Sequence, residues 1–150
     1  MRVEIEKIDK ELPESARLMI HEETESIRRL AGFIEQENYK YMLISCYKDD
    51  KIHQVKCREI FYIESLMEVQ YIHMKDEIYC TRKRLYELEK ILPQEFVRAS
   101  RSVLLNMAKV EQYKPLSGGL MMAEFENGDS SYISRKYLKG LRAKIKEGLL

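Results

Sequence analysis

The stretch Phe-Val-Arg-Ala-Ser-Arg-Ser-Val-Leu-Leu-Asn, residues 96–106, decides how the rest of the chain is interpreted. It places two arginines and two serines inside an apolar run that otherwise favours a β-strand. Arg98 and Arg101 each carry a guanidinium fork that suits phosphate oxygens or the edge of a guanine, and the serines and the asparagine add short polar groups. On these residues alone, an edge strand with solvated arginines is as good an interpretation as a binding site.

The composition is that of a soluble globular protein. With 150 residues, of which 45% are hydrophobic and 34% charged, the chain can form one domain of about a hundred residues and a small appendage. No stretch approaches the ~20 apolar residues of a membrane span, and the first residues open no signal peptide, so we expect a cytoplasmic protein. The three cysteines and three histidines have no metal-ligand or disulfide spacing, which predicts no metal site.

The net charge of +1 hides a division along the chain. Residues 1–40 contain seven Lys/Arg and ten Asp/Glu, whereas residues 41–150 contain nineteen and fifteen, so the second part is the basic one. Its positive charge is clustered, because Arg82–Arg84 are consecutive and residues 135–146 contain six Lys/Arg and no acid. Local patches of this kind, rather than the net charge, attract phosphates. A merely solvated basic face is an equally common reason for such a helix.

Residues 1–40 form the predicted appendage. Arg2–Ile8 alternates between apolar and charged residues, and Ala16–Ile20 is a short apolar run, so both indicate strands. After Thr24, a suitable N-cap, apolar residues recur at helical spacing as far as Gln36: Ile27, Leu30, Ala31 and Ile34. This apolar stripe must be buried on the strands, on the neighbouring domain or on a second copy of the protein, and the sequence does not choose among these.

Residues 41–150 form the second predicted domain, which is mainly β with α, an α+β class. Short runs at regular spacing predict antiparallel strands in a meander or small barrel: 41–47, 52–56, 60–64, 69–74, 77–81, 109–114, 120–126 and 130–133. Asn127-Gly128 is a strong hairpin signal. A helix is expected over Arg82–Leu92, with its leucines in the core, and another after Ser134, with Tyr137, Leu141 and Ile145 on its apolar face.

Signatures of catalysis are missing from the sequence. It has no Gly-rich phosphate loop, no G-x-S-x-G or H-E-x-x-H motif, and no histidine spaced from a serine or cysteine in a recognisable way. The adjacent acids Asp49-Asp50 and Glu22-Glu23 point apart in a strand or helix, so neither makes a catalytic pair. We therefore expect no enzyme, no catalytic residue, no cofactor and no small-molecule substrate.

Three blocks of the chain together resemble the LytTR family of bacterial DNA-binding domains. Residues 98–106 match the signature R-x-x-R-S-x-x-x-N, Ile60–Glu64 resembles the family's early core strand, and Tyr132–Tyr137 resembles its closing Ser-Arg-Arg/Lys motif. The blocks occur in the family's order over about a hundred residues, roughly 46–145. The first forty residues lie outside the resemblance and are too short for a receiver domain, so the chain is similar to a free-standing LytTR regulator.

The resemblance implies a bacterial transcription factor whose mostly β fold binds promoter DNA through loops, in two successive major grooves and across the minor groove between them. The positions that match the family's base readers are Gln70, Arg101 and Lys136. Arg98, Ser102 and Arg135 resemble positions that contact the DNA backbone or support such contacts. From the residues themselves, Ser134 at the start of the last helix, and Lys139 and Arg142 on its basic face, are further candidates for contacts to phosphate. The resemblance also implies a small membrane protein that restrains the regulator, and it leaves a homodimer open.

One departure from the family pattern concerns the loop Ser65–Glu68 before Gln70. It contains an acid and two apolar residues where a loop that faces DNA would prefer Lys, Ser or Asn. Either Glu68 turns away from the DNA or it accepts a hydrogen bond from a cytosine amino group. Two other functions are kept beside sequence-specific duplex binding: a protein-interaction module of the same fold that does not bind DNA, and an RNA-binding protein.

Overall fold

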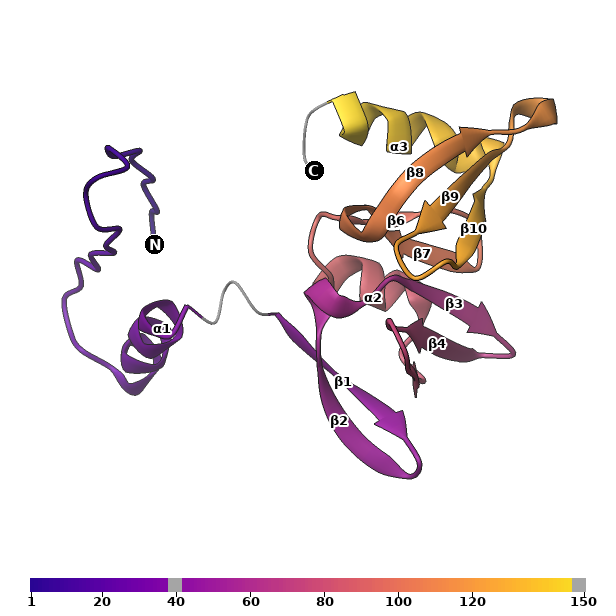
Figure 1. Ribbon diagram of the computed structural model, residues 1–150. Helices are drawn as coiled ribbons and strands as arrows, with labels where there is room; N and C mark the ends of the chain where they lie inside the picture. Colours follow the sequence, from indigo (N-terminus) through magenta and orange to yellow (C-terminus); the bar gives the residue numbers. More distant parts are fainter. Residues whose placement is uncertain (38–41, 147–150) are drawn as a thin grey trace. The chain divides into compact units, whose positions relative to one another are not determined.

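The computed structural model describes residues 1–37 and 42–146 and divides the chain into two compact units, residues 1–40 and 41–150 (Figure 1). The first unit contains one helix, α1 (Glu25–Glu35), which confirms the predicted one. It begins where the Thr24 hydroxyl accepts a hydrogen bond from the Ile27 N–H at 3.3 Å. None of its residues is fully buried within the chain, and Leu30 and Phe33 are 38% and 46% exposed.

The two strands predicted before this helix are wrong. Among the described residues 1–37 there is no strand, and Arg2–Ile8 and Ala16–Ile20 run as irregular chain with almost every side chain exposed. Alternation of apolar and charged residues makes a strand only where a neighbouring strand takes its backbone hydrogen bonds. The described residues of this unit, 1–37, contain no such neighbour.

The second unit is built on two antiparallel sheets (Figure 1). The larger sheet has seven strands in the order β2-β1-β5-β4-β3-β7-β6, and the smaller has three in the order β10-β9-β8. Their bounds are β1 Leu43–Lys48, β2 Lys51–Lys56, β3 Tyr62–Leu66, β4 Val69–His73, β5 Ile78–Thr81, β6 Phe96–Arg98, β7 Val103–Asn106, β8 Val110–Pro115, β9 Met121–Phe125 and β10 Ser130–Ile133. Helices α2 (Leu85–Ile91) and α3 (Arg135–Lys146) complete the α+β fold and confirm the predicted class. No helix among the described residues is long and apolar enough to cross a bilayer.

The central strands β3 and β7 are covered on both faces. Ile63 of β3 and Leu104 of β7 belong to a core cluster that also contains Leu85 and Leu88 of α2. Their neighbours Tyr62 and Leu105 point to the opposite face and pack in a second cluster with the small sheet and α3. The two cores therefore fix the ends of β3 and β7 from both sides, and the candidate site is at one of those ends.

The predicted helix starting after Ser134 is confirmed, but of its expected apolar face only Leu141 is buried. Leu138 and Leu141 are buried, whereas Ile145 is 39% exposed. The side chains of these two leucines are three residues apart and lie on one face, which packs in the second core cluster. Tyr137 is only half-buried. Apolar residues were available on two neighbouring faces, and the one that is buried carries the two leucines.

Candidate nucleic-acid interface

The central stretch, residues 96–106, is two strands joined by a tight turn, not one strand. β6 and β7 pair in antiparallel register, with Arg98 opposite Leu104, and the four residues Ala99–Ser102 reverse the chain. The Ala99 N–H donates to the Val103 carbonyl at 2.9 Å, and the Ser102 N–H donates to the Ser100 hydroxyl at 3.2 Å. This turn presents Arg101 to solvent at the end of the sheet.

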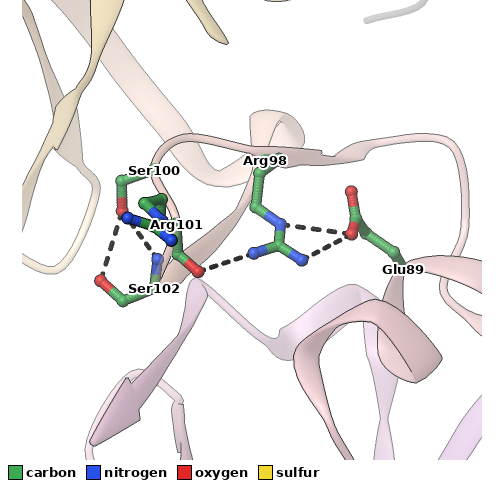
Figure 2. Close-up of polar contacts among 5 residues, drawn as sticks. All are labelled: Glu89, Arg98, Ser100, Arg101 and Ser102. Carbon is green, nitrogen blue, oxygen red and sulfur yellow. Dashed lines mark hydrogen bonds and ion pairs between the residues drawn. The ribbon is translucent and has the colours of Figure 1, made fainter. Parts of the chain in front are cut away.

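The guanidinium of Arg98 is bound by groups of the same chain. Its Nε and Nη2 contact the Glu89 carboxylate at 3.2 and 2.7 Å, and its Nη1 donates to the Arg101 carbonyl at 2.7 Å (Figure 2). Only 18% of the Arg98 side chain is exposed. Glu89 lies on α2, so the guanidinium ties this helix to the backbone of the turn. Of the two roles that the sequence left open for Arg98, the geometry fits the supporting one.

Arg101 has the opposite environment. Its residue is exposed, and its guanidinium makes no hydrogen bond or ion pair within residues 1–37 and 42–146. Figure 2 shows the Arg101 carbonyl held by Arg98, while the Ser100 hydroxyl lies between the Ser102 N–H and, at 3.4 Å, the Ser102 hydroxyl. The backbone that carries Arg101 is therefore held in place, and its charged end is available to a ligand.

Two backbone hydrogen bonds bring other segments to this turn. The Ser134 N–H donates to the Ala99 carbonyl at 2.8 Å, which places the start of α3 against the turn. The Ser65 N–H donates to the Ser102 carbonyl at 2.7 Å, which places the end of β3 on its other side. Segments around residues 65, 100 and 135, far apart in the sequence, thus form one continuous edge of the domain.

The first turn of α3 adds positive charge to this edge. The Ser134 carbonyl accepts the N–H groups of Tyr137 and Leu138 at 3.0 and 3.1 Å, so Ser134 occupies the N-cap position. Lys136 is exposed, with its Nζ 5.5 Å from the centre of the Tyr137 ring. The free amides of a helix N-terminus favour anions, so Lys136 stands where a phosphate or an acceptor on a base would be attracted.

A basic face continues along α3 from this point. Arg135, Lys139 and Arg142 border one surface hollow of the helix together with Leu138, Ala143 and Lys146. The stem of Arg135 crosses the backbone of Gly119, where a Cβ atom would lie 2.9 Å from the Arg135 Cδ. On another side of the helix, Lys144 Nζ donates to the Gln94 carbonyl at 3.4 Å. The basic face is therefore distinct from the side that docks the helix.

Gln70 is a correction to the predicted set of base readers. It is 1% exposed, and its amide nitrogen donates to the Lys83 carbonyl. Its amide oxygen accepts from the Ser65 hydroxyl at 2.7 Å. On β4, residue 70 faces the same side as the buried Ile72, because alternate residues of a strand share a face. The side chain has no surface to offer to DNA, and it holds the β5–α2 connection against the β3–β4 hairpin.

The acid that departs from the family pattern turns towards the protein. Glu68 Oε1 is 3.6 Å from Arg84 Nη2, in the basic run before α2. Both side chains are more than half exposed, so the pair is weak, but it directs the carboxylate to a cation of the same chain.

Glu89, the partner of Arg98, was not predicted from the sequence. Nothing in a helical pattern indicates that one of the acids of the helix supports an arginine on a later strand.

The comparisons with known proteins identify the family of the domain. The family model described as LytTr DNA-binding domain matches residues 50–146. The chain belongs to this family. A LytTr DNA-binding domain from Bacillus cereus superposes with a TM-score of 0.66 at 20% identity, over 69% of this chain and 95% of that one.

Two relatives from Staphylococcus aureus align over 99 residues, 66% of this chain and 67% of theirs. Each is named as an uncharacterized HTH-type transcriptional regulator, one from strain NCTC 8325 at 28% identity and one from strain MRSA252 at 27%. The family match over residues 50–146 contains the three sequence blocks of the LytTR resemblance, as predicted.

Proposed function

We propose that this LytTR protein is a transcriptional regulator that binds duplex DNA sequence-specifically through the edge formed by the β6–β7 turn and the start of α3. The observation that carries the proposal is the hydrogen bond from the Ser134 N–H to the Ala99 carbonyl, at 2.8 Å, because it joins the turn that carries the exposed Arg101 to the first turn of α3, which carries the exposed Lys136. Arg101 would read a guanine with its bidentate fork, and Lys136 would contact a base or a phosphate.

The proposed role of each residue follows from the exposure of its side chain and from its partners within the chain. Ser102 and the α3 residues Arg135, Lys139 and Arg142 are exposed and would contact the DNA backbone, and Ser134 would offer its position at the helix N-terminus. Arg98 would act through the turn that it holds, not on DNA. The names of the S. aureus relatives support a regulatory role. In the described part of this chain, α2 and α3 are separated by five strands, so they do not form a helix-turn-helix pair.

The test is Arg101→Ala in the full chain, measured on a duplex selected from a randomised pool. We expect a loss of about 1–3 kcal/mol in binding free energy, flatter discrimination at one base position and an unchanged melting temperature. A variant that melts well below the parent, yet keeps its ranking of sequences, would show that Arg101 is structural and would overturn the assignment.

Lys139→Ala and Arg142→Ala are the matched comparison. Each should weaken binding to all duplexes alike and lower the salt slope by about one unit, with the ranking of sequences intact. About six phosphate contacts imply a loss of roughly a thousandfold for the parent protein between 50 and 200 mM salt. A chain that binds no duplex would be a protein-interaction module, and a preference for single strands would indicate an RNA binder.

A further inference from the structure

The tip of the β3–β4 hairpin combines an apolar side chain with an unfavourable backbone. The two residues between the strands, Met67 and Glu68, have φ of 48° and 68°. Two-residue turns with positive φ at both positions favour Asn, Asp and Gly, and the β1–β2 turn of this protein uses Asp49 and Asp50. Met67 is not one of these favoured residues, and it is 96% exposed. Strain of this kind persists where the rest of the structure or a function requires it.

The tip is also part of the proposed DNA edge. The Ser65 N–H donates to the Ser102 carbonyl at 2.7 Å, so the hairpin leaves the sheet directly beside the turn that carries Arg101. The pairing of Glu68 with Arg84 at 3.6 Å draws the one acid of the tip towards the protein. The apolar Leu66, 53% exposed, and Met67 remain as the end of the hairpin.

We propose that Met67 contacts the C5-methyl group of a thymine in the major groove, next to the base read by Arg101, and so adds a thymine preference to the binding site. The inference rests on the proposed function. The thymine methyl is the one apolar group that the major groove displays, and side chains recognise it by apolar contact. Methionine is unbranched and adaptable, so it can follow a methyl group from a hairpin tip.

The test replaces each thymine of the selected duplex by uracil, which removes only the methyl group. For the full chain, we expect a loss of about fourfold in affinity at one or two positions, the worth of one buried methyl-sized group. For Met67→Ala, the same positions should become insensitive to the replacement. Met19→Ala, at a site 85% exposed in the N-terminal unit, is the matched control and should keep the uracil sensitivity.

A second variant separates contact from turn geometry. Met67→Asn suits positive φ, so it should melt at or above the temperature of the parent while it loses the uracil sensitivity. A parent protein that binds the duplex but loses nothing with uracil at any position, or a Met67→Ala protein that keeps the full sensitivity, overturns this inference and leaves the proposed function standing. A parent that binds no duplex overturns both.

Discussion

Arg98 and Arg101 carry the same side chain three residues apart, and the fold gives them opposite tasks. Arg98 is on β6, where its guanidinium lies between Glu89 of α2 and the carbonyl of Arg101. Arg101 is at the bend, where its side chain points to solvent. A charge that is fixed by its own protein stabilises the fold, and a charge without a partner is free to bind a ligand.

Replacement of Arg98 by alanine should therefore reduce stability first and DNA affinity second. We expect a loss of about 1–3 kcal/mol in the free energy of unfolding, because the Arg101 carbonyl and the partly exposed Glu89 lose charge-assisted partners. Denaturant unfolding measures this loss. Glu89→Gln should cost less, since the amide can still accept from Arg98. A folded Arg98→Ala protein whose stability equals that of the parent would contradict the supporting role.

Two buried thiols make the stability depend on alkaline pH. Burial raises the pKa of the Cys57 thiol to about 11, and burial with the nearby Cys80 raises the pKa of Cys46 to about 11. In the unfolded chain the thiols titrate near their ordinary value of about 8.5, so between these values the unfolded state has lost protons that the folded state keeps. This contribution to stability is present below pH ~8.5 and is lost as pH rises towards 11.

The prediction is a fall in the free energy of unfolding from pH ~8.5 upward, which is shallower in a Cys46→Ala, Cys57→Ala variant. The variant should be less stable at neutral pH, because each change leaves a small void in the first core cluster. Denaturant midpoints at a series of pH values give both quantities. Parallel pH curves for the parent and the variant would show that other groups control the alkaline limit.

At the scale of elements, the β8–β9 connection positions the first turn of α3. Gly118 and Gly119 have nearly the same positive φ, 75° and 76°, but only at Gly119 would a Cβ atom meet the Arg135 side chain. A Cβ atom at Gly118 would meet nothing within 4 Å. An alanine would therefore meet the same unfavourable φ at both positions, but only at Gly119 would it also contact Arg135.

Gly119→Ala should weaken DNA binding more than Gly118→Ala does. Both changes should cost about 1–2 kcal/mol of stability, the usual penalty for a side chain in a left-handed conformation. Only Gly119→Ala displaces Arg135 from its place beside the helix N-terminus, which should lower both the affinity and the salt slope. The measurement is a salt titration of binding for each variant. Equal slopes for the two variants would mean that Arg135 does not contact phosphate.

At the scale of the whole molecule, both core clusters and both sheets lie within the second unit. Helix α1 contributes no buried residue, and its apolar stripe still requires cover from the β domain or from another copy of the chain. Removal of residues 1–36 tests whether α1 has either kind of cover.

Removal of residues 1–36 should leave a protein that unfolds cooperatively and binds the same duplex, because no residue of the core or of the proposed interface is lost. If the stripe is covered in the full chain, the truncated protein should show lower solubility, a lower melting temperature or a smaller mass in solution. Calorimetry and light scattering on both proteins measure these quantities. A truncated protein unchanged in all three would mean that α1 neither docks nor self-associates.

The sequence by itself was sufficient for the local elements of the β domain. Short strands, the Asn127-Gly128 hairpin and the leucines of α2 were correctly predicted, because their signals lie in neighbouring residues. The strands of residues 1–20 were predicted wrongly for the same reason, since a local alternation does not contain its partner strand. The LytTR motifs also indicated the family and the position of Arg101.

Tertiary structure alone decided which of the matching polar residues can reach a ligand. Gln70 and Arg98 were matched to the family's DNA contacts together with Arg101, but the Lys83 carbonyl and Glu89 that engage them are thirteen and nine residues away along the chain. The closeness of residues 65, 100 and 135 also depends on hydrogen bonds between distant segments. Sequence patterns record which side chains are present and which face they share, whereas exposure depends on contacts that form only when the chain is folded.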